Sequence, residues 1–124
     1  MGYECKLYVV EKRNVFDEEK RYAQVIAMFD MCKYYTLSSI ISIFPKTDCY
    51  FYGDDGDTKI LKDEYDKPLT EIPIEKVIAI LETDIADGND YRRIPPVLAA
   101  LKAIKEQKDY GIWQDVVVLH YGYW

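Results

Sequence analysis

The sequence predicts an α+β domain with a mostly antiparallel sheet of about five strands, on which two long helices and one short helix pack. Two observations predict this class. Strand-like runs lie at both ends of the chain, and two helical patterns follow each other in its second half without a regular alternation of strand and helix. The 124 residues show no repeat and no linker, so residues 1–124 are expected to form a single domain.

The first two predicted elements are strands. In "YECKLYVV" (3–10), Cys5, Leu7 and Val9 recur at every second residue and therefore share one face. The run "YAQVIAMFDMC" (22–32) is apolar on both faces. This pattern favours a strand that is covered on both sides over an amphipathic helix.

A short helix and a hairpin are predicted next. The stretch "TLSSIISIF" (36–44) is typical of a short helix that ends before Pro45. In "CYFYGDDGDTKIL" (49–61), two strand-like runs flank a cluster of Gly and Asp. This is typical of a β-hairpin, because Asp55 and Gly56 both tolerate the positive φ of a tight turn.

The second half of the chain predicts two long helices and a final strand. In the stretch 67–85 we expect a helix with Thr70 or Glu71 near its cap and Pro73 in its first turn, because the apolar residues recur at helical spacing: Ile74, Val77, Ile78, Leu81 and Ile85. Residues 94–108 show a second apolar stripe and form the second helix. Residues 113–124 are expected to form a strand that is buried from Val116 to Leu119.

The letters YGDD at residues 52–55 also occur at the metal-binding hairpin of RNA-dependent polymerases. A two-metal site needs carboxylates from separate strands, and a polymerase needs a basic surface that a chain of net charge −6 lacks. An EF-hand is excluded as well, because Gly56 at its sixth position would place Phe51 where an oxygen ligand is required. The four residues are therefore interpreted as part of a turn, with no metal and no cofactor.

Charge and tyrosine content predict a protein-binding surface. The net charge of −6 opposes direct binding to nucleic acids and to anionic membranes, and twelve tyrosines suit an interface. If the hairpin and residues 82–90 lie on one side, their acidic side chains form one negative patch. The residues expected to bind a partner are Asp54, Asp55, Asp57, Tyr52, Tyr65, Tyr91, Arg92 and Arg93.

The two arginines stand directly before the helix at 94–108. Arginines beside a helix N-terminus can hold an anion, because the free amides and the helix dipole both favour negative charge. In an acidic chain we favour the alternative that they form internal ion pairs with Asp84, Asp87 or Asp90.

A different class of function rests on Asp30, Cys32 and His120. If the strands that carry them are neighbours, a carboxylate, a thiol and an imidazole gather, which are the parts of a cysteine nucleophile. No sequence motif supports this arrangement. An enzyme or ligand-binding domain that uses these three residues is therefore kept as an alternative.

The cysteine pattern favours the cytoplasm. The three cysteines are odd in number, lie in apolar runs and form no CxxC pair, which predicts buried thiols and neither a disulfide framework nor a zinc site. No run approaches the roughly 18 apolar residues of a membrane helix, and the first residues lack a signal-peptide pattern. We therefore expect a soluble cytoplasmic protein.

Five stretches resemble small uncharacterised proteins that bacteriophages and mobile elements of gut Firmicutes carry: "GYECKLYVV", "VIAMFDMCK", "YGDDGDT", "DYRRIPP" and "VVVLHYGYW". By analogy, the resemblance implies an inhibitor of host machinery, as anti-CRISPR proteins are. Together with the acidity, it favours a non-enzymatic interaction or inhibitor protein that binds a basic protein surface. A self-assembling structural phage component, joined through its sheet edges, is a third alternative.

Overall fold

The computed structural model of the chain describes residues 4–13, 22–32, 43–47, 49–52, 58–61, 68–88, 93–113 and 115–123. They form β1 (Glu4–Lys12), β2 (Tyr22–Cys32), β3 (Lys46–Thr47), β4 (Cys49–Tyr52), β5 (Thr58–Leu61), β6 (Leu69–Pro73), α1 (Ile74–Ala86), α2 (Ile94–Asp109) and β7 (Asp115–Tyr123). The predicted α+β class, the antiparallel sheet and the two long helices are confirmed.

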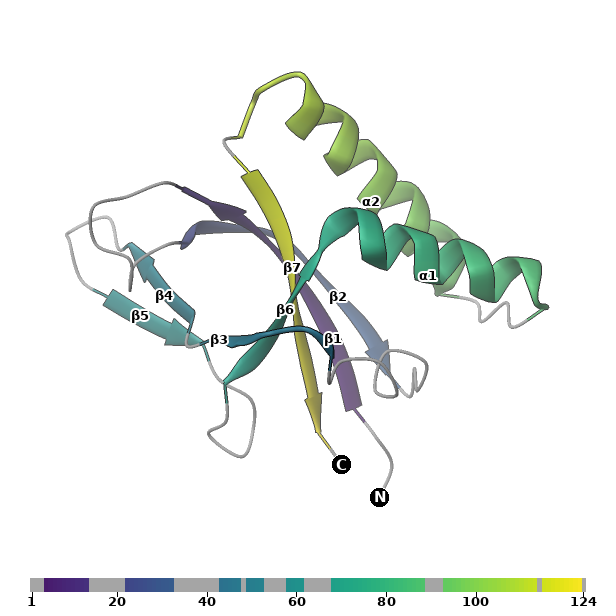
Figure 1. Ribbon diagram of the computed structural model, residues 1–124, viewed down its shortest axis with the longest axis horizontal. Helices are drawn as coiled ribbons and strands as arrows, with labels where there is room; N and C mark the ends of the chain where they lie inside the picture. The colour runs from purple at the N-terminus through teal and green to yellow at the C-terminus, as the bar shows by residue number, and fades with distance from the viewer. Residues whose placement is uncertain are drawn as a thin grey trace.

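The strands form one sheet in the order β3-β6-β7-β1-β2-β4-β5. The first five strands are antiparallel to their neighbours and make the body of the sheet. Among the described residues, the antiparallel pair β4–β5 is attached to this body by one parallel pairing, between Tyr22 and Phe51. Figure 1 shows this hairpin at one end of the molecule and the two helices at the other.

One prediction about the elements needs correction, and a second falls outside the described residues. The segment 67–85 is not one helix, because Leu69–Pro73 form strand β6 and the helix begins only at Ile74. The pairing of β6 with β7 overrides the weak helical pattern there, and Pro73 sits at the junction between strand and helix. Most of the short helix predicted over 36–44 cannot be compared, because residues 36–42 lie outside the described residues. The described part of the chain contains two α-helices, α1 and α2.

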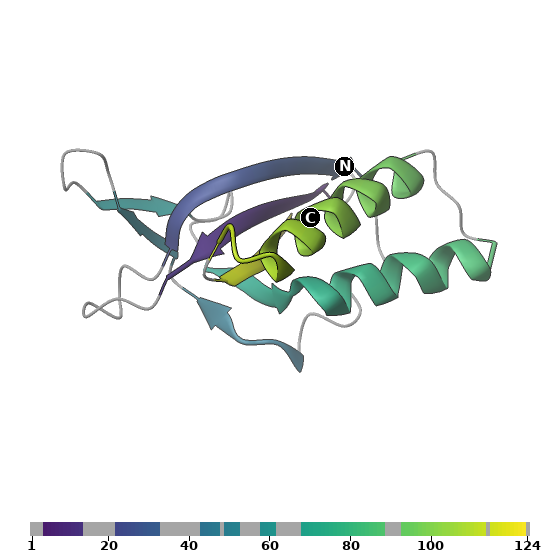
Figure 2. The ribbon, with the colours of Figure 1, turned by 90° about the horizontal axis from the view of Figure 1, so that it is seen from above.

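The larger core lies between the sheet and the helix pair. Leu7 and Val9 of β1 and Val118 of β7 pack there against fully buried Leu81 and Leu101 of the two helices. Both views show α1 and α2 running alongside each other (Figures 1 and 2). The Lys108 ammonium contacts carboxylate oxygens of Glu75 on α1 and of Asp115 on β7, each at 3.2 Å, and so ties α2 to both neighbours.

Strand β2 is less covered than its sequence predicts. Its bounds agree with the prediction, but Val25 is 45% exposed and Met28 is 49% exposed. The expectation that both faces are covered is wrong. Ile26, Ala27, Phe29 and Met31 belong to the helix-side core, whereas Val25 and Met28 pair with Val10 and Tyr8 of β1, which face away from the helices.

The sheet curls so that the edge strand β3 comes close to β4, the second strand from the opposite edge. One residue, Asp48, joins β3 at one edge to β4 next to β2, so Thr47 and Cys49 are at most about 7.6 Å apart. A flat sheet would hold these strands several strand spacings apart. The curl encloses a second core, formed by Val10, Tyr22, Leu69, Val117 and Leu119 on the face opposite the helices.

A polar network holds this closure. The buried hydroxyl of Tyr22 donates to Oε1 of Glu71 on β6 at 2.7 Å and contacts the hydroxyl of Thr47 on β3 at 3.2 Å. The Lys12 ammonium donates to the second oxygen of Glu71 at 3.1 Å. Glu71 therefore links the start of β2 and the end of β1 to the far side of the sheet.

Replacing Glu71 with alanine is expected to cost about 2 kcal/mol of unfolding free energy, because a buried hydroxyl and an ammonium both lose a charged acceptor. Urea unfolding measures the change. The matched control is Glu75→Ala, which removes a half-exposed carboxylate paired with Lys108 and should cost about 0.5 kcal/mol or less. Equal losses in the two variants would show that the network does not hold the curl.

Candidate functional site

The two strands of the predicted hairpin are present as β4 and β5. Strands β4 and β5 pair in antiparallel register up to Tyr52 and Thr58. In the sequence, residues 53–57 connect these two paired ends, and their interpretation as a turn stays a prediction. Asp54, Asp55 and Asp57 themselves lie outside the described residues.

Of the other predicted binding residues, only Tyr52 and Arg93 belong to described segments. Tyr65, Tyr91 and Arg92 lie outside them, so their role stays a prediction. The guanidinium of Arg93, directly before α2, donates to the backbone oxygen of Asp30 and lies 3.6 Å from that residue's carboxylate. The internal pairing expected for Arg93 therefore exists, but with Asp30 on β2.

The two acidic segments do not form one patch. The hairpin β4–β5 and the C-terminal end of α1 lie at opposite ends of the molecule in both views (Figures 1 and 2). Within the second segment, Asp84 is buried in α1, while Glu82 and Asp87 are exposed. Of the two acidic segments, the one that contains the β4–β5 hairpin is therefore distant from the C-terminal end of α1.

The alternative catalytic group is not assembled. Strand β1 lies between β2 and β7, so the backbones of Asp30 and His120 are about two strand spacings, roughly 10 Å, apart. Asp30 pairs with Lys6 and His120 pairs with Leu7, which places the two side chains on opposite faces of the sheet. A base must lie within hydrogen-bond reach or one water of its partner, and this arrangement prevents it for Asp30 and His120. The Cys32 side chain lies outside the described part of the chain.

His120 is nevertheless an unusual residue. It is buried beside its cross-strand neighbour Thr70, whose hydroxyl accepts a hydrogen bond from the Lys46 ammonium at 3.0 Å. Burial, reinforced by the positive charge of Lys46, lowers the pKa of His120 from 6.5 to about 4. The imidazole is therefore neutral at neutral pH.

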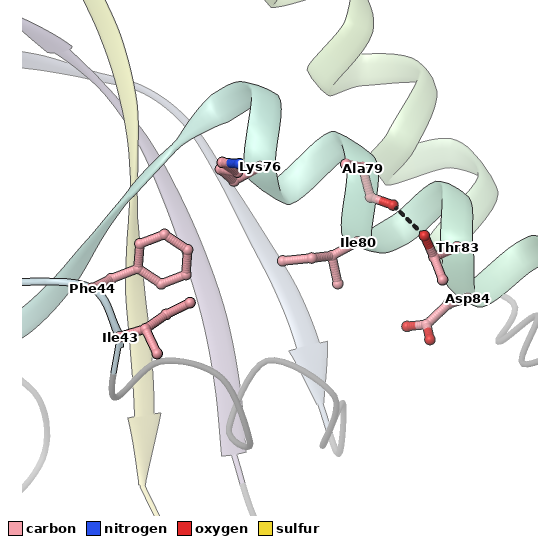
Figure 3. A pocket seen from close by; sticks show the side chains of 7 residues that line it. All are labelled: Ile43, Phe44, Lys76, Ala79, Ile80, Thr83 and Asp84. Atoms are coloured by element: carbon pink, nitrogen blue, oxygen red, sulfur yellow. Dashed lines mark hydrogen bonds between the residues drawn. The ribbon is translucent and has the colours of Figure 1, made fainter.

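A pocket beside α1, here called the α1 pocket, was not predicted. Its cavity volume is about 350 Å³, within the usual range for small-molecule sites. Ile43 and Phe44 line one side of it, and Lys76, Ala79, Ile80, Thr83 and Asp84 of α1 line the other. Figure 3 shows the Ile80 side chain pointing from α1 toward Ile43 and Phe44.

The polar groups of the α1 pocket lie mainly at its two ends. Lys76 is near the start of α1 and Asp84 near its end, whereas the side chains of Ala79 and Ile80 between them are apolar (Figure 3). The Thr83 hydroxyl donates to the backbone oxygen of Ala79 at 2.9 Å, so its hydrogen is used within the helix. The α1 residues that line the pocket recur at helical spacing and so share one face of the helix: Lys76, Ala79, Ile80, Thr83 and Asp84. This face lies beside the buried face formed by Val77, Ile78 and Leu81. The spacing was therefore visible in the sequence.

Other site types find no support in the part of the chain that the structure describes. No group of three or more His, Cys, Asp or Glu side chains there is placed to hold a metal ion. Neither described helix combines the length and the apolar character required to cross a membrane. No protein-family model, curated protein or solved structure matches the chain.

Proposed function

We propose that this protein is a non-enzymatic interaction domain that binds a basic protein surface through the tip of its β4–β5 hairpin. The observation that carries the proposal is the position of the charge. Residues 53–57 contain three aspartates and no basic residue, and their charge of −3 is half of the net charge of −6. In the sequence they join two strands that lie at one end of the molecule (Figure 1).

The framework behind the hairpin is nearly neutral. The described ranges contain eleven acidic and ten basic residues, counted from the sequence. Many of these charges pair with each other, as Lys12 does with Glu71, Arg13 with Glu11 and Lys102 with Glu82. A negative potential therefore concentrates at the hairpin, where it can steer and orient a positively charged partner.

The mode of attachment of the hairpin also suits recognition. A parallel pairing of Phe51 with Tyr22 links it to the body of the sheet, and Tyr22 is anchored in the second core. A rigid scaffold thus presents a connecting loop, which is a common arrangement for binding residues. The proposed partner is a basic cytoplasmic protein, since the three cysteines show no disulfide pattern.

The test is neutralisation of the hairpin tip by the triple change Asp54→Asn, Asp55→Asn and Asp57→Asn. Tagged wild-type protein is used to capture partners from a bacterial host lysate, and the partner is then purified for direct binding measurements. The hairpin variant should bind at least tenfold more weakly, because the charges that face the partner are lost. Wild-type binding should also weaken as salt is raised.

A matched control distinguishes local charge from net charge. The triple change Glu82→Gln, Asp87→Asn and Glu106→Gln removes the same number of negative charges from exposed positions on or beside the helices. This control should bind the partner like the wild type. Capture of no basic partner, or an equal loss in both triple variants, would refute the proposed role of the hairpin.

Self-assembly is a second candidate function, and one observation favours it. Val25 and Met28 of β2 are large apolar side chains exposed on an outer part of the sheet. However, the register of β1 and β2 shifts at three places, and such bulges protect a strand edge from pairing with another copy. The hairpin proposal is therefore preferred.

A further inference from the structure

We propose that the α1 pocket is a binding site for a small amphipathic anion, an apolar chain or ring with one carboxylate. In this arrangement the carboxylate pairs with Lys76, and the apolar part lies between Phe44 and Ile80. The proposal is independent of the hairpin, which lies at the other end of the molecule (Figure 1).

The walls of the pocket select an apolar group. Ile43, Phe44 and Ile80 offer branched and aromatic surface around a cavity of about 350 Å³. Ile43 is 76% exposed, so a ligand that covers it removes apolar surface from water. A cavity of this kind with few polar groups is the usual form of a small-molecule site.

The charge at one end selects an anion. The Lys76 ammonium makes no ion pair or hydrogen bond within the described part of the chain, whereas Lys12, Lys102, Lys105 and Lys108 each contact a carboxylate. Lys76 also stands in the first turn of α1, where free backbone amides add positive potential. A ligand carboxylate placed there gains a charge-assisted contact.

The opposite end fixes the orientation of the ligand. Asp84 is eight residues after Lys76, about 12 Å along the helix axis, and its carboxylate is buried. A second anionic group would be left without a counter-charge beside this buried residue, which already has an interaction partner of its own, so the uncharged end of the ligand lies there. The site therefore suits a monoanion with one apolar end and excludes a dianion with a charge at each end.

The test uses octanoate as the probe and octanol as its uncharged counterpart. Amide NMR spectra of the full chain are recorded during titration with each compound. Octanoate should produce saturable shifts at Ala79, Ile80 and Thr83 of α1 and at Phe44. Octanol should bind about tenfold more weakly, because it lacks the charged contact with Lys76.

Three variants measure separately how the charge of Lys76 and the apolar walls contribute to ligand binding. Lys76→Gln should weaken octanoate binding about tenfold and leave octanol binding unchanged. Ile80→Glu places a charge in the apolar wall and should abolish saturable binding of both probes. Lys102→Gln, which removes an exposed lysine of α2 that pairs with Glu82, is the control and should bind both probes like the wild type.

The same spectra confirm that each variant is folded, because the amide dispersion of the sheet is recorded with every titration. The proposal is overturned if octanoate gives no saturable shift on α1, or if octanol binds as tightly as octanoate to the wild type. It is also overturned if Lys76→Gln leaves octanoate binding unchanged, or if octylamine binds more tightly than octanoate.

Discussion

Lowering the pH from 7 to 4 is expected to remove about 3 kcal/mol of unfolding free energy from the wild-type protein through His120 alone. Burial, reinforced by Lys46, lowers the pKa of this histidine from 6.5 to about 4 in the folded protein. Between these two values the unfolded chain binds a proton that the folded protein does not. Stability therefore rises with pH across this window, by about 1.4 kcal/mol for each pH unit.

The contribution of His120 is complete above pH 6.5 and is lost progressively as the pH falls toward 4. Urea unfolding at several pH values measures it, with His120→Gln as the reference, since this is the only histidine of the chain. Carboxylates titrate in both proteins and cancel in the difference. We expect the stability advantage of the wild type over the variant to shrink by about 3 kcal/mol between pH 7 and pH 4. A constant difference would mean that the pKa of His120 is the same in the folded protein as in the unfolded chain.

The second large effect is expected from Leu101→Ala in the helix-side core. Leu101 of α2 is fully buried among apolar side chains from the sheet and from α1. Its replacement removes apolar surface and leaves a cavity that the surrounding elements fill only in part, at a cost of about 3 kcal/mol. Thermal or urea unfolding should show a correspondingly lower midpoint.

The control for this variant is Ile112→Ala, which truncates an aliphatic side chain of similar size. Ile112 follows α2 and is 60% exposed, so its loss should change stability by about 0.5 kcal/mol or less. A loss at Leu101 as small as that at Ile112 would contradict the packing of α2 on the sheet. A loss at both positions would indicate that Ile112 is covered in solution, for example by a second copy of the chain.

Several elements could be predicted from the sequence because their patterns are local. The two-residue period of β1 and the continuous apolar run of β7 each indicate a strand without reference to any neighbour. The hairpin strands are predicted by the Asp and Gly cluster between two strand-like runs. Helix α2 is predicted by its apolar stripe, with two prolines in its first turn. These features depend on residues only a few positions apart.

Other features depend on which strands become neighbours. Strand β6 is apolar enough to continue the helical pattern of α1, and only its pairing with β7 makes it a strand. The β2 pattern predicts cover on both faces, yet Val25 and Met28, on the face away from the helices, are exposed. Strand pairing is a long-range choice that the spacing of residues within one segment does not encode.

For the candidate sites, the acidity of the chain and the aspartates between β4 and β5 follow directly from the order of residues. The tertiary structure separates Asp30 from His120 by strand β1 and places the hairpin and the C-terminal end of α1 at opposite ends of the molecule. It also brought Phe44 against α1 to form the α1 pocket. The physical reason is that composition and local period follow the order of residues, whereas a site forms where distant segments are brought together by burial of apolar surface.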